Sequence, residues 1–214
     1  MKDICYWSLG ETWLAVLREV YGSGQSVGDE TRESLHVCAS FAQGDYDSDP
    51  VLVRFASREN VEQMRKVFFT AEPNGFGHSY RDRILGPRGR CDLSDVIELL
   101  KREPLSKRAA IVLAGEGDGR TPCINAVHFL RRGQGLVVTY FARGQDVFHK
   151  FYADGVCIFE MARRVADAIG VPVDRVTGVI SSAHVYLADL AAVGDVLAGA
   201  DAIPQAATGH GTAK

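Results

Sequence analysis

The sequence has little of what would assign it to several common classes of protein. Its 214 residues carry a formal net charge of only −3, so no basic excess indicates a nucleic-acid polymer as a partner. No apolar run approaches the roughly 18 residues that cross a bilayer, and the first five residues lack the apolar stretch of a secretion signal. We therefore expect a cytoplasmic protein that does not enter the membrane, and any anionic ligand must be held by a few local arginines.

Cysteine occurs only five times, and no two cysteines form a CxxC pair. The odd number and wide spacing argue against a disulfide framework and against a zinc site. The six histidines are scattered without an HExxH pattern, so no metal site is expected. Free thiols are the simplest interpretation for Cys5, Cys38, Cys91, Cys123 and Cys157.

Helix and strand patterns predict an α+β fold with a mixed or antiparallel sheet and flanking helices. Apolar spacing and capping residues indicate helices, whereas short apolar runs between turns indicate strands. The expected helices are 8–21, 59–69, 92–102, 155–169 and 187–197. The expected strands are 35–41, 50–55, 109–114, 123–130, 136–142 and 176–181. Glycine-rich segments at 115–119 and 132–135 favour antiparallel connections between the strands that they join.

The length of the chain fits a single domain, which we place at residues 1–199. From Ala200 onward the sequence is small, polar and rich in alanine and glycine, so residues 200–214 are expected to form a disordered tail. The GEGDG segment at 115–119 lacks the lysine of a Walker loop and the spacing of a dinucleotide-binding loop. A hairpin turn is the favoured interpretation of that segment.

Cys123 differs from the other four cysteines in its position. A cysteine inside an apolar element is usually part of the core, and we adopt that interpretation for the other four. Cys123 instead follows Pro122 where a glycine-rich turn meets a strand. Such a junction can leave a thiol at the mouth of a cleft, so Cys123 is the candidate nucleophile.

Two further groups of polar residues follow at the ends of neighbouring elements. Arg143-Gly144-Gln145-Asp146 ends the next expected strand. A guanidinium favours the thiolate form of a nearby cysteine and can also bind phosphate. His184 and Tyr186 alternate, so their side chains share a face if that segment is extended. The pair suits either simple packing or hydrogen bonds to a sugar.

Taken in order, these motifs resemble the thymidylate synthase superfamily. The motifs are Pro122-Cys123, Arg143-Gly144-Gln145-Asp146 and Ala183-His184-Val185-Tyr186. Their separations agree with those between the family's thiol, phosphate-binding arginine and sugar-binding histidine. Upstream, 79–84, 92–102 and 107–109 resemble the stretch that leads to the family's paired arginines. The resemblance covers residues 79–190 well and the first 78 residues poorly.

The resemblance implies a thymidylate synthase-like fold, reduced in size, in a homodimer whose sheets pack back to back. It also implies a pyrimidine nucleoside monophosphate as substrate and 5,10-methylenetetrahydrofolate as cofactor. By position, Cys123 is the thiolate that adds to C6 of the pyrimidine, Arg143 holds the phosphate and assists the thiolate, and Asp146 binds the folate.

The remaining roles are carried over in the same way. His184 and Tyr186 bind the sugar hydroxyl, and Arg108, with Lys107 beside it, is the phosphate ligand given to the neighbouring subunit. The family's catalytic glutamate has Glu62 as its first candidate, from its place after the expected strand 50–55, and Glu59 as its second.

Asp154 departs from the family pattern in an informative way. It lies eight residues after Asp146, where thymidylate synthases have an asparagine that pairs with N3 and O4 of uracil. Cytosine presents an N3 acceptor beside an amino donor, and a carboxyl group suits that edge. Aspartate at this place is similar to cytidylate hydroxymethylases. Alternatively, Asp154 caps a helix that begins at Gly155.

Other departures concern the reaction itself. The residues around the motifs differ from the family at Ile124, Ala142, Gly144 and Ser182. The sequence ends about 30 residues after His184 without the apolar segment that closes over folate, which disfavours hydride transfer. We therefore expect folate-dependent 5-hydroxymethylation of CMP or dCMP. The alternatives are 5-methylation of uridylate, deoxyuridylate or a related nucleotide, and a catalytically silent nucleotide-binding protein.

Overall fold

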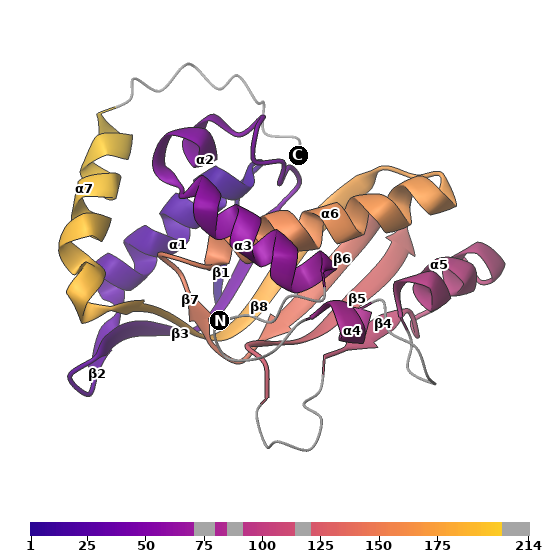
Figure 1. Cartoon of the computed structure of the whole chain (residues 1–214), viewed down its shortest axis with the longest axis horizontal. Coiled ribbons are helices and arrows are strands. Elements are labelled where there is room, and N and C mark those ends of the chain that lie inside the picture. The colour runs from indigo at the N-terminus through magenta and orange to yellow at the C-terminus, as the bar shows by residue number, and fades with distance from the viewer. Residues whose placement is uncertain (71–79, 85–91, 114–120, 203–214) are drawn as a thin grey trace.

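An eight-stranded mixed sheet organises the chain in the computed structural model, which describes residues 1–70, 80–84, 92–113 and 121–202 (Figure 1). The strands follow the order β1-β3-β8-β6-β5-β4, with β2 paired to β3 and β7 paired to β8. Their bounds are β1 Lys2–Cys5, β2 Gln25–Val27, β3 Thr31–Phe41, β4 Ala110–Val112, β5 Ile124–Arg132, β6 Gly135–Ala142, β7 Gln145–Asp146 and β8 Val173–Tyr186.

The helices gather on one side of this sheet (Figure 1). Helices α1 and α6 pack on the central strands, and α3 packs on α6. The described helices are α1 Leu9–Ser23, α2 Pro50–Phe55, α3 Arg58–Phe69, α4 Arg81–Ile84, α5 Leu93–Arg102, α6 Phe151–Ile169, the 3-10 turn η1 Leu187–Asp189 and α7 Leu190–Asp201. The predicted α+β class with a mixed sheet and flanking helices is therefore confirmed.

The two faces of the sheet differ in burial. On β6, Leu136, Val138 and Tyr140 face the helices and are buried, whereas Val137 and Thr139 between them are only partly buried. The same alternation runs through the first half of β8. One face of the sheet thus forms the core with α1 and α6. The other, which we name the open face, carries no helix among the described residues.

Local capping explains why the best-defined helices match their predicted positions. The Ser8 hydroxyl accepts from the Glu11 backbone N–H while the Glu11 carboxylate accepts from the Ser8 N–H, which closes a capping box at the start of α1. Asp92 and Asp95 form the equivalent box at α5. Both helices begin one residue after the predicted cap.

The strand predicted at 50–55 is wrong, because these residues form helix α2. The Asp49 carboxylate accepts from the backbone N–H groups of Val51 and Leu52, and Pro50 takes the first helical position. The second Asp49 oxygen accepts from Gly10 N at 2.7 Å, so the cap also ties α2 to α1. Capping and this tertiary contact outweigh the strand preference of the apolar run.

The antiparallel connections predicted around β5 are confirmed, since β5 pairs antiparallel with both β4 and β6. Strand β6 pairs parallel with β8, and helix α6 makes the crossover between them. Strands β1, β2 and β7 were not predicted. Helix α7 includes Ala200 and Asp201, so the expected tail cannot begin at Ala200. The turn at 115–119 and residues 203–214 lie outside the described residues.

A bend crosses the sheet at the same level in two adjacent strands. On β8 the buried residues change phase between Ile180 and Ala183, so that both intervening serines are partly buried. On β3 the neighbouring His36 has φ 55°, the left-handed conformation that side chains other than glycine rarely adopt. The bend turns the last residues of β8 relative to the rest of the strand. His184 and Tyr186 lie in this turned segment.

Candidate functional site

Cys123 and Arg143 lie side by side at one end of the sheet. Cys123 directly precedes β5 and Arg143 directly follows β6, and the register of this antiparallel pair places Ile124 opposite Ala142. The Arg143 backbone N–H donates to the Cys123 carbonyl oxygen at 2.9 Å. The β5–β6 hairpin thus brings two residues that are 20 positions apart in the sequence into direct contact.

The Arg143 side chain is anchored on the segment that carries the thiol. Its Nε donates to the carbonyl oxygens of Thr121 at 3.0 Å and Pro122 at 3.2 Å. The side chain is otherwise exposed, and its two terminal nitrogens have no hydrogen-bond partner among the described residues. These two nitrogens can bind an anion next to the partly buried Cys123 thiol.

Strand β7 brings the third motif to the same end. It pairs parallel with β8 and places Gln145 opposite Ala183 and Asp146 opposite His184. The Val147 N–H, just after β7, donates to the His184 carbonyl at 2.8 Å. On its other side β7 is held to α1, because Trp13 Nε1 donates to the Val147 carbonyl at 2.8 Å.

His184 and Tyr186 point to one face of β8, as expected for an extended segment. Their rings meet edge to face with centroids 5.8 Å apart. The imidazole also lies beside the Gly144 backbone, since a Cβ built on Gly144 would be 3.8 Å from His184 Cε1. The structure therefore brings the sugar-binding candidates next to the loop that begins with Arg143.

The Asp146 carboxylate is fixed at the entrance to α6. Its Oδ1 accepts from the backbone N–H groups of Phe148 at 3.1 Å and His149 at 3.0 Å. The His149 ring is held in turn by Asp189, with Nε2 and Oδ2 2.9 Å apart. Asp146 Oδ2 has no partner among the described residues, so it can accept a hydrogen bond from a ligand.

Asp154 lies inside the first turn of α6 and is only 3% exposed. The alternative that it caps a helix beginning at Gly155 is wrong, because α6 begins at Phe151 and Lys150 occupies the cap position. Gln145 Nε2 donates to Asp154 Oδ2 at 2.7 Å. Burial raises the pKa of Asp154 to about 7, and the hydrogen bond from Gln145 opposes that rise.

Gln145 is a residue to which sequence reasoning assigned no role. It is 1% exposed, and within the described part of the chain neither its Oε1 nor Asp154 Oδ1 has a hydrogen-bond partner. Buried polar atoms are nearly always paired, so two unpaired oxygens on one buried pair indicate that a partner is missing. The sequence could have indicated this residue, because a glutamine stands between Arg143 and Asp146 just after a strand that was predicted to be buried.

Arg108 and Lys107 are not brought to Cys123 within the chain. Ala110 on β4 pairs with His128 on β5, so Arg108 lies beyond His128 while Cys123 lies at the opposite end of β5. The two are roughly 20 Å apart along the strand. Arg108 is exposed and ion-paired with Glu103, and the Lys107 carbonyl accepts from the His128 ring at 3.0 Å.

Glu62 is likewise not connected with Cys123 by any contact among the described residues. It is exposed on α3 and ion-paired with Arg65, whose Nε and Nη2 also donate to Glu160 on α6 at 2.8 and 2.6 Å. Glu59, the second candidate, is exposed on the same helix near Gln63. Both glutamates lie on helix α3, and their catalytic role stays a prediction.

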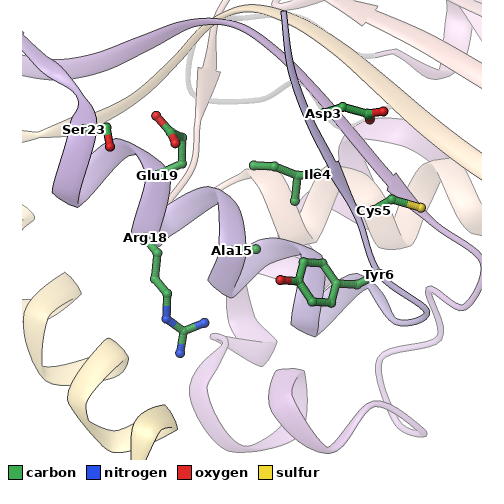
Figure 2. Close-up of a pocket in the computed structure, with 8 residues that line it drawn as sticks. All are labelled: Asp3, Ile4, Cys5, Tyr6, Ala15, Arg18, Glu19 and Ser23. Atoms are coloured by element: carbon green, nitrogen blue, oxygen red, sulfur yellow. The ribbon is translucent and has the colours of Figure 1, made fainter. Parts of the chain in front are cut away.

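A cavity of about 510 Å³ opens between β1 and α1, well away from this site (Figure 2). Two of its charged residues have protein partners, Arg18 with Asp201 and Glu19 with Lys2. Strands β3, β8 and β6 separate it from β5. None of the predicted site residues lines it.

Two negative findings apply to the described part of the chain only. No group of three or more histidine, cysteine, aspartate or glutamate side chains there is arranged to hold a metal ion. None of its helices combines the length and apolarity needed to span a bilayer.

Comparison with known proteins gives several relatives over most of the chain. A protein of Methanothermobacter marburgensis is 27% identical over 201 residues, which cover 83% of this chain and 90% of the relative. One of Methanosarcina barkeri is 24% identical over 202 residues, covering 90% and 93%. Both carry the name "Putative thymidylate synthase". No protein-family profile matches the chain. These relatives confirm the thymidylate synthase-like resemblance that the motifs indicated, and each match covers most of the chain.

The raised pKa of Asp154 predicts a pH-dependent stability. Between the ordinary aspartate pKa near 4 and the folded value of about 7, the folded protein retains a proton that the unfolded chain has lost. Stability therefore falls as the pH rises through this range. Asp154→Asn lacks this ionisable group. Between pH 4 and pH 8 the free energy of unfolding of wild type should therefore fall by up to about 4 kcal/mol relative to that of the variant. Denaturant unfolding at several pH values measures this.

The exposed Asp174 offers a matched control, because Asp174→Asn also removes one carboxylate. Its difference from wild type should change little over the same range. A difference between wild type and Asp154→Asn that stays constant with pH would contradict the burial of an ionisable Asp154.

Proposed function

We propose, from the premise that the chain is thymidylate synthase-like over most of its length, that it transfers a one-carbon unit to C5 of a pyrimidine nucleoside monophosphate. One observation carries the proposal. Cys123 and Arg143 are in direct backbone contact at the sheet end where Asp146 and His184 also lie. A thiol, an anion-binding guanidinium and sugar-binding side chains are the groups that this reaction needs.

Cys123 acts as the nucleophile. C5 of a pyrimidine is a weak nucleophile until a thiolate adds at C6, because the new S–C6 bond moves the electron pair of the C5–C6 double bond onto C5. C5 would then form a bond to the one-carbon unit and lose its proton while the bond from that carbon to the cofactor nitrogen breaks. Water would add to the transferred carbon, and the electron pair returned to C5 would expel the sulfur from C6. The covalent step divides one difficult reaction into easier ones.

Arg143 orients the nucleotide while it supports the thiolate. Its Nε is bound to the Thr121 and Pro122 carbonyls, which fixes the plane of the guanidinium and leaves the terminal nitrogens for the phosphate. The His184 ring lies beside Gly144, the residue after Arg143, and the Tyr186 ring packs edge to face against His184. They suit the sugar hydroxyls, whether of ribose or deoxyribose.

Asp146 fits the pterin of a folate cofactor. Two backbone N–H groups hold Oδ1 and so orient the carboxylate, while Oδ2 remains an acceptor for a ring N–H. Methylenetetrahydrofolate, when bound, supplies the one-carbon unit. Asp146 is adjacent in register to His184, so cofactor and sugar are held on neighbouring strands.

Asp154 favours cytosine over uracil. A buried carboxyl group with a pKa of about 7 is protonated in a large share of molecules at neutral pH, and a protonated carboxyl can donate to N3 of cytosine. We therefore propose cytidylate, CMP or dCMP, as the substrate. The product is assigned as the 5-hydroxymethyl nucleotide, in which water adds the hydroxyl to the transferred carbon, because aspartate at this position resembles cytidylate hydroxymethylases.

The open face of the sheet supports a homodimer. A row of apolar side chains crosses four strands there, since the register aligns Val112, Ala126, Phe141 and Val179. Val112 is 60% and Phe141 40% exposed. A sheet face that meets water normally alternates to polar residues, so a second copy packed back to back is the occupant that we assign. The distant Arg108 would then serve the partner's phosphate site.

Cys123→Ser should leave the fold intact and lower turnover by at least about a thousandfold, because the nearly isosteric hydroxyl cannot replace the thiolate. Product formation with methylenetetrahydrofolate and a cytidylate measures the effect. Cys5→Ser, at an exposed position on β1, is the matched control and should keep its activity. More than about a tenth of wild-type turnover in Cys123→Ser, or a barrier change below roughly 1.4 kcal/mol, would rule out covalent catalysis.

Arg108→Ala and Cys123→Ser proteins, each nearly inactive alone, should regain activity when they are mixed and exchange subunits. One site of the mixed dimer then has Cys123 from one chain and Arg108 from the other. Cys123→Ser mixed with Arg143→Ala is the control without recovery, because both groups belong to the same site in one chain. Exchange without recovery in the first mixture would place Arg108 outside the partner's site.

Wild-type protein given CMP, dCMP, UMP or dUMP with methylenetetrahydrofolate should convert a cytidylate fastest, and the product mass should show a hydroxymethyl rather than a methyl group. Tetrahydrofolate, and not dihydrofolate, should accumulate. Asp154→Asn should shift preference toward uracil by about 10- to 100-fold, since the amide can accept from N3–H and donate to O4. Faster turnover of dUMP than of either cytidylate by wild type would overturn the role given to Asp154.

A further inference from the structure

The buried pair of Gln145 and Asp154 joins the β7 segment to α6 directly behind Arg143. Gln145 stands two residues after Arg143, and its side chain crosses to the first turn of α6. The pair therefore links the loop that holds the phosphate with the helix that carries the proposed base-binding carboxyl. Both side chains are nearly fully buried, yet each keeps one oxygen that has no partner among the residues the structure describes.

The direction of the hydrogen bond determines what these two oxygens can do. Because Gln145 Nε2 donates to Asp154 Oδ2, a proton on the carboxyl group resides on the other oxygen, Oδ1. Asp154 then offers a donor at Oδ1. The same amide orientation leaves Gln145 Oε1 as an acceptor, so the neutral pair presents one donor and one acceptor.

We infer that Gln145 is a specificity-determining residue, which reads the 4-position of the base with Oε1 while Asp154 reads N3 with Oδ1. Cytosine presents an acceptor at N3 and a donor at its 4-amino group, so both contacts are complementary. Uracil presents the reverse pattern at both atoms, so both contacts would be repulsive. This inference rests on the proposed function, since it concerns the base of the same nucleotide.

The pair reads uracil only if the amide turns over. Asp154 would then donate to Gln145 Oε1, Asp154 would accept from N3–H, and Gln145 Nε2 would donate to O4. Base choice thus depends on the orientation of the Gln145 amide as well as on the carboxyl group. Neither oxygen is exposed in the described structure, so the base reaches the pair after the side chains around it move apart.

Tyr140 provides a matched comparison in the same part of the core. Its hydroxyl is also buried and unpaired, but it lies on β6 against the backbone of β8, where a Cβ on Gly178 would be 2.4 Å from the tyrosine oxygen. Tyr140→Phe removes this hydroxyl without touching the Gln145–Asp154 hydrogen bond. It should therefore leave base discrimination unchanged.

The test measures the dissociation constants of CMP and UMP by calorimetry, for wild type, Gln145→Leu and Tyr140→Phe, each checked for folding by its thermal transition. Wild type should bind CMP more tightly than UMP. Gln145→Leu should reduce this preference by about 10- to 100-fold, because one contact to the base is lost and Asp154 loses its donor. If Gln145→Leu does not fold, Gln145→Met is used instead, because methionine keeps the length of the glutamine side chain. Tyr140→Phe should keep the preference within about twofold of wild type.

Binding separates failure of this inference from failure of the proposed function, because it needs no turnover. Equal weakening of CMP and UMP binding in Gln145→Leu, with the preference retained, would overturn the specificity role and leave the proposed function standing. Tighter binding of UMP than of CMP by wild type would overturn it as well. A folded wild-type protein that binds neither CMP nor UMP, and neither of their deoxy forms titrated in the same way, would overturn both.

Discussion

The hydrogen bond from the Arg143 backbone to the Cys123 carbonyl is the constraint on which the site depends. It lies at the open end of the β5–β6 hairpin, so every pair in that ladder helps to fix the thiol beside the guanidinium. The Arg143 side chain then binds the Thr121 and Pro122 carbonyls, which holds the residues before the thiol as well. Cys123, at a strand junction, is thereby placed by the sheet rather than by a loop.

The bend in β3 and β8 explains why sequence patterns found two segments of one strand. The alternation of buried residues predicted a strand ending at Ser181, and the phase of burial changes at that point in the structure. The second segment was recognised only through His184 and Tyr186. No local signal in β8 indicates the bend, and the unusual residue beside it, His36 in the neighbouring strand, is about 145 positions away in the sequence. Local sequence patterns identify helices and strands well, whereas the face of the sheet to which each side chain points depends on the assembled sheet.

Helices α1 and α5, which begin with a capping box, were predicted closely, whereas the side-chain cap of α2 was overlooked. Asp92 defines α5 from within its own turn, whereas α2 needs Asp49, whose second oxygen is bound by α1. The error at 50–55 matters for function, because the choice of Glu62 rested on its place after that supposed strand. Gln145 was overlooked for a related reason. Its hydrogen bond with Asp154 forms only when α6 has packed over β7, so the sequence alone does not reveal it.

The buried Asp154 carboxyl group, with its unpaired oxygen, lowers the stability of the core. Asparagine at this position would avoid the ionisation that destabilises the folded state above neutral pH. Nothing in the packing of α6 requires the acid, because Gln145 could donate equally well to an amide oxygen. The acid and its unpaired oxygen lie at the end of the sheet that also holds Cys123, Arg143 and His184. A ligand that completes the hydrogen bonds of Asp154 and Gln145 would offset this cost, and the edge of a cytosine ring has the donor and acceptor that the pair lacks.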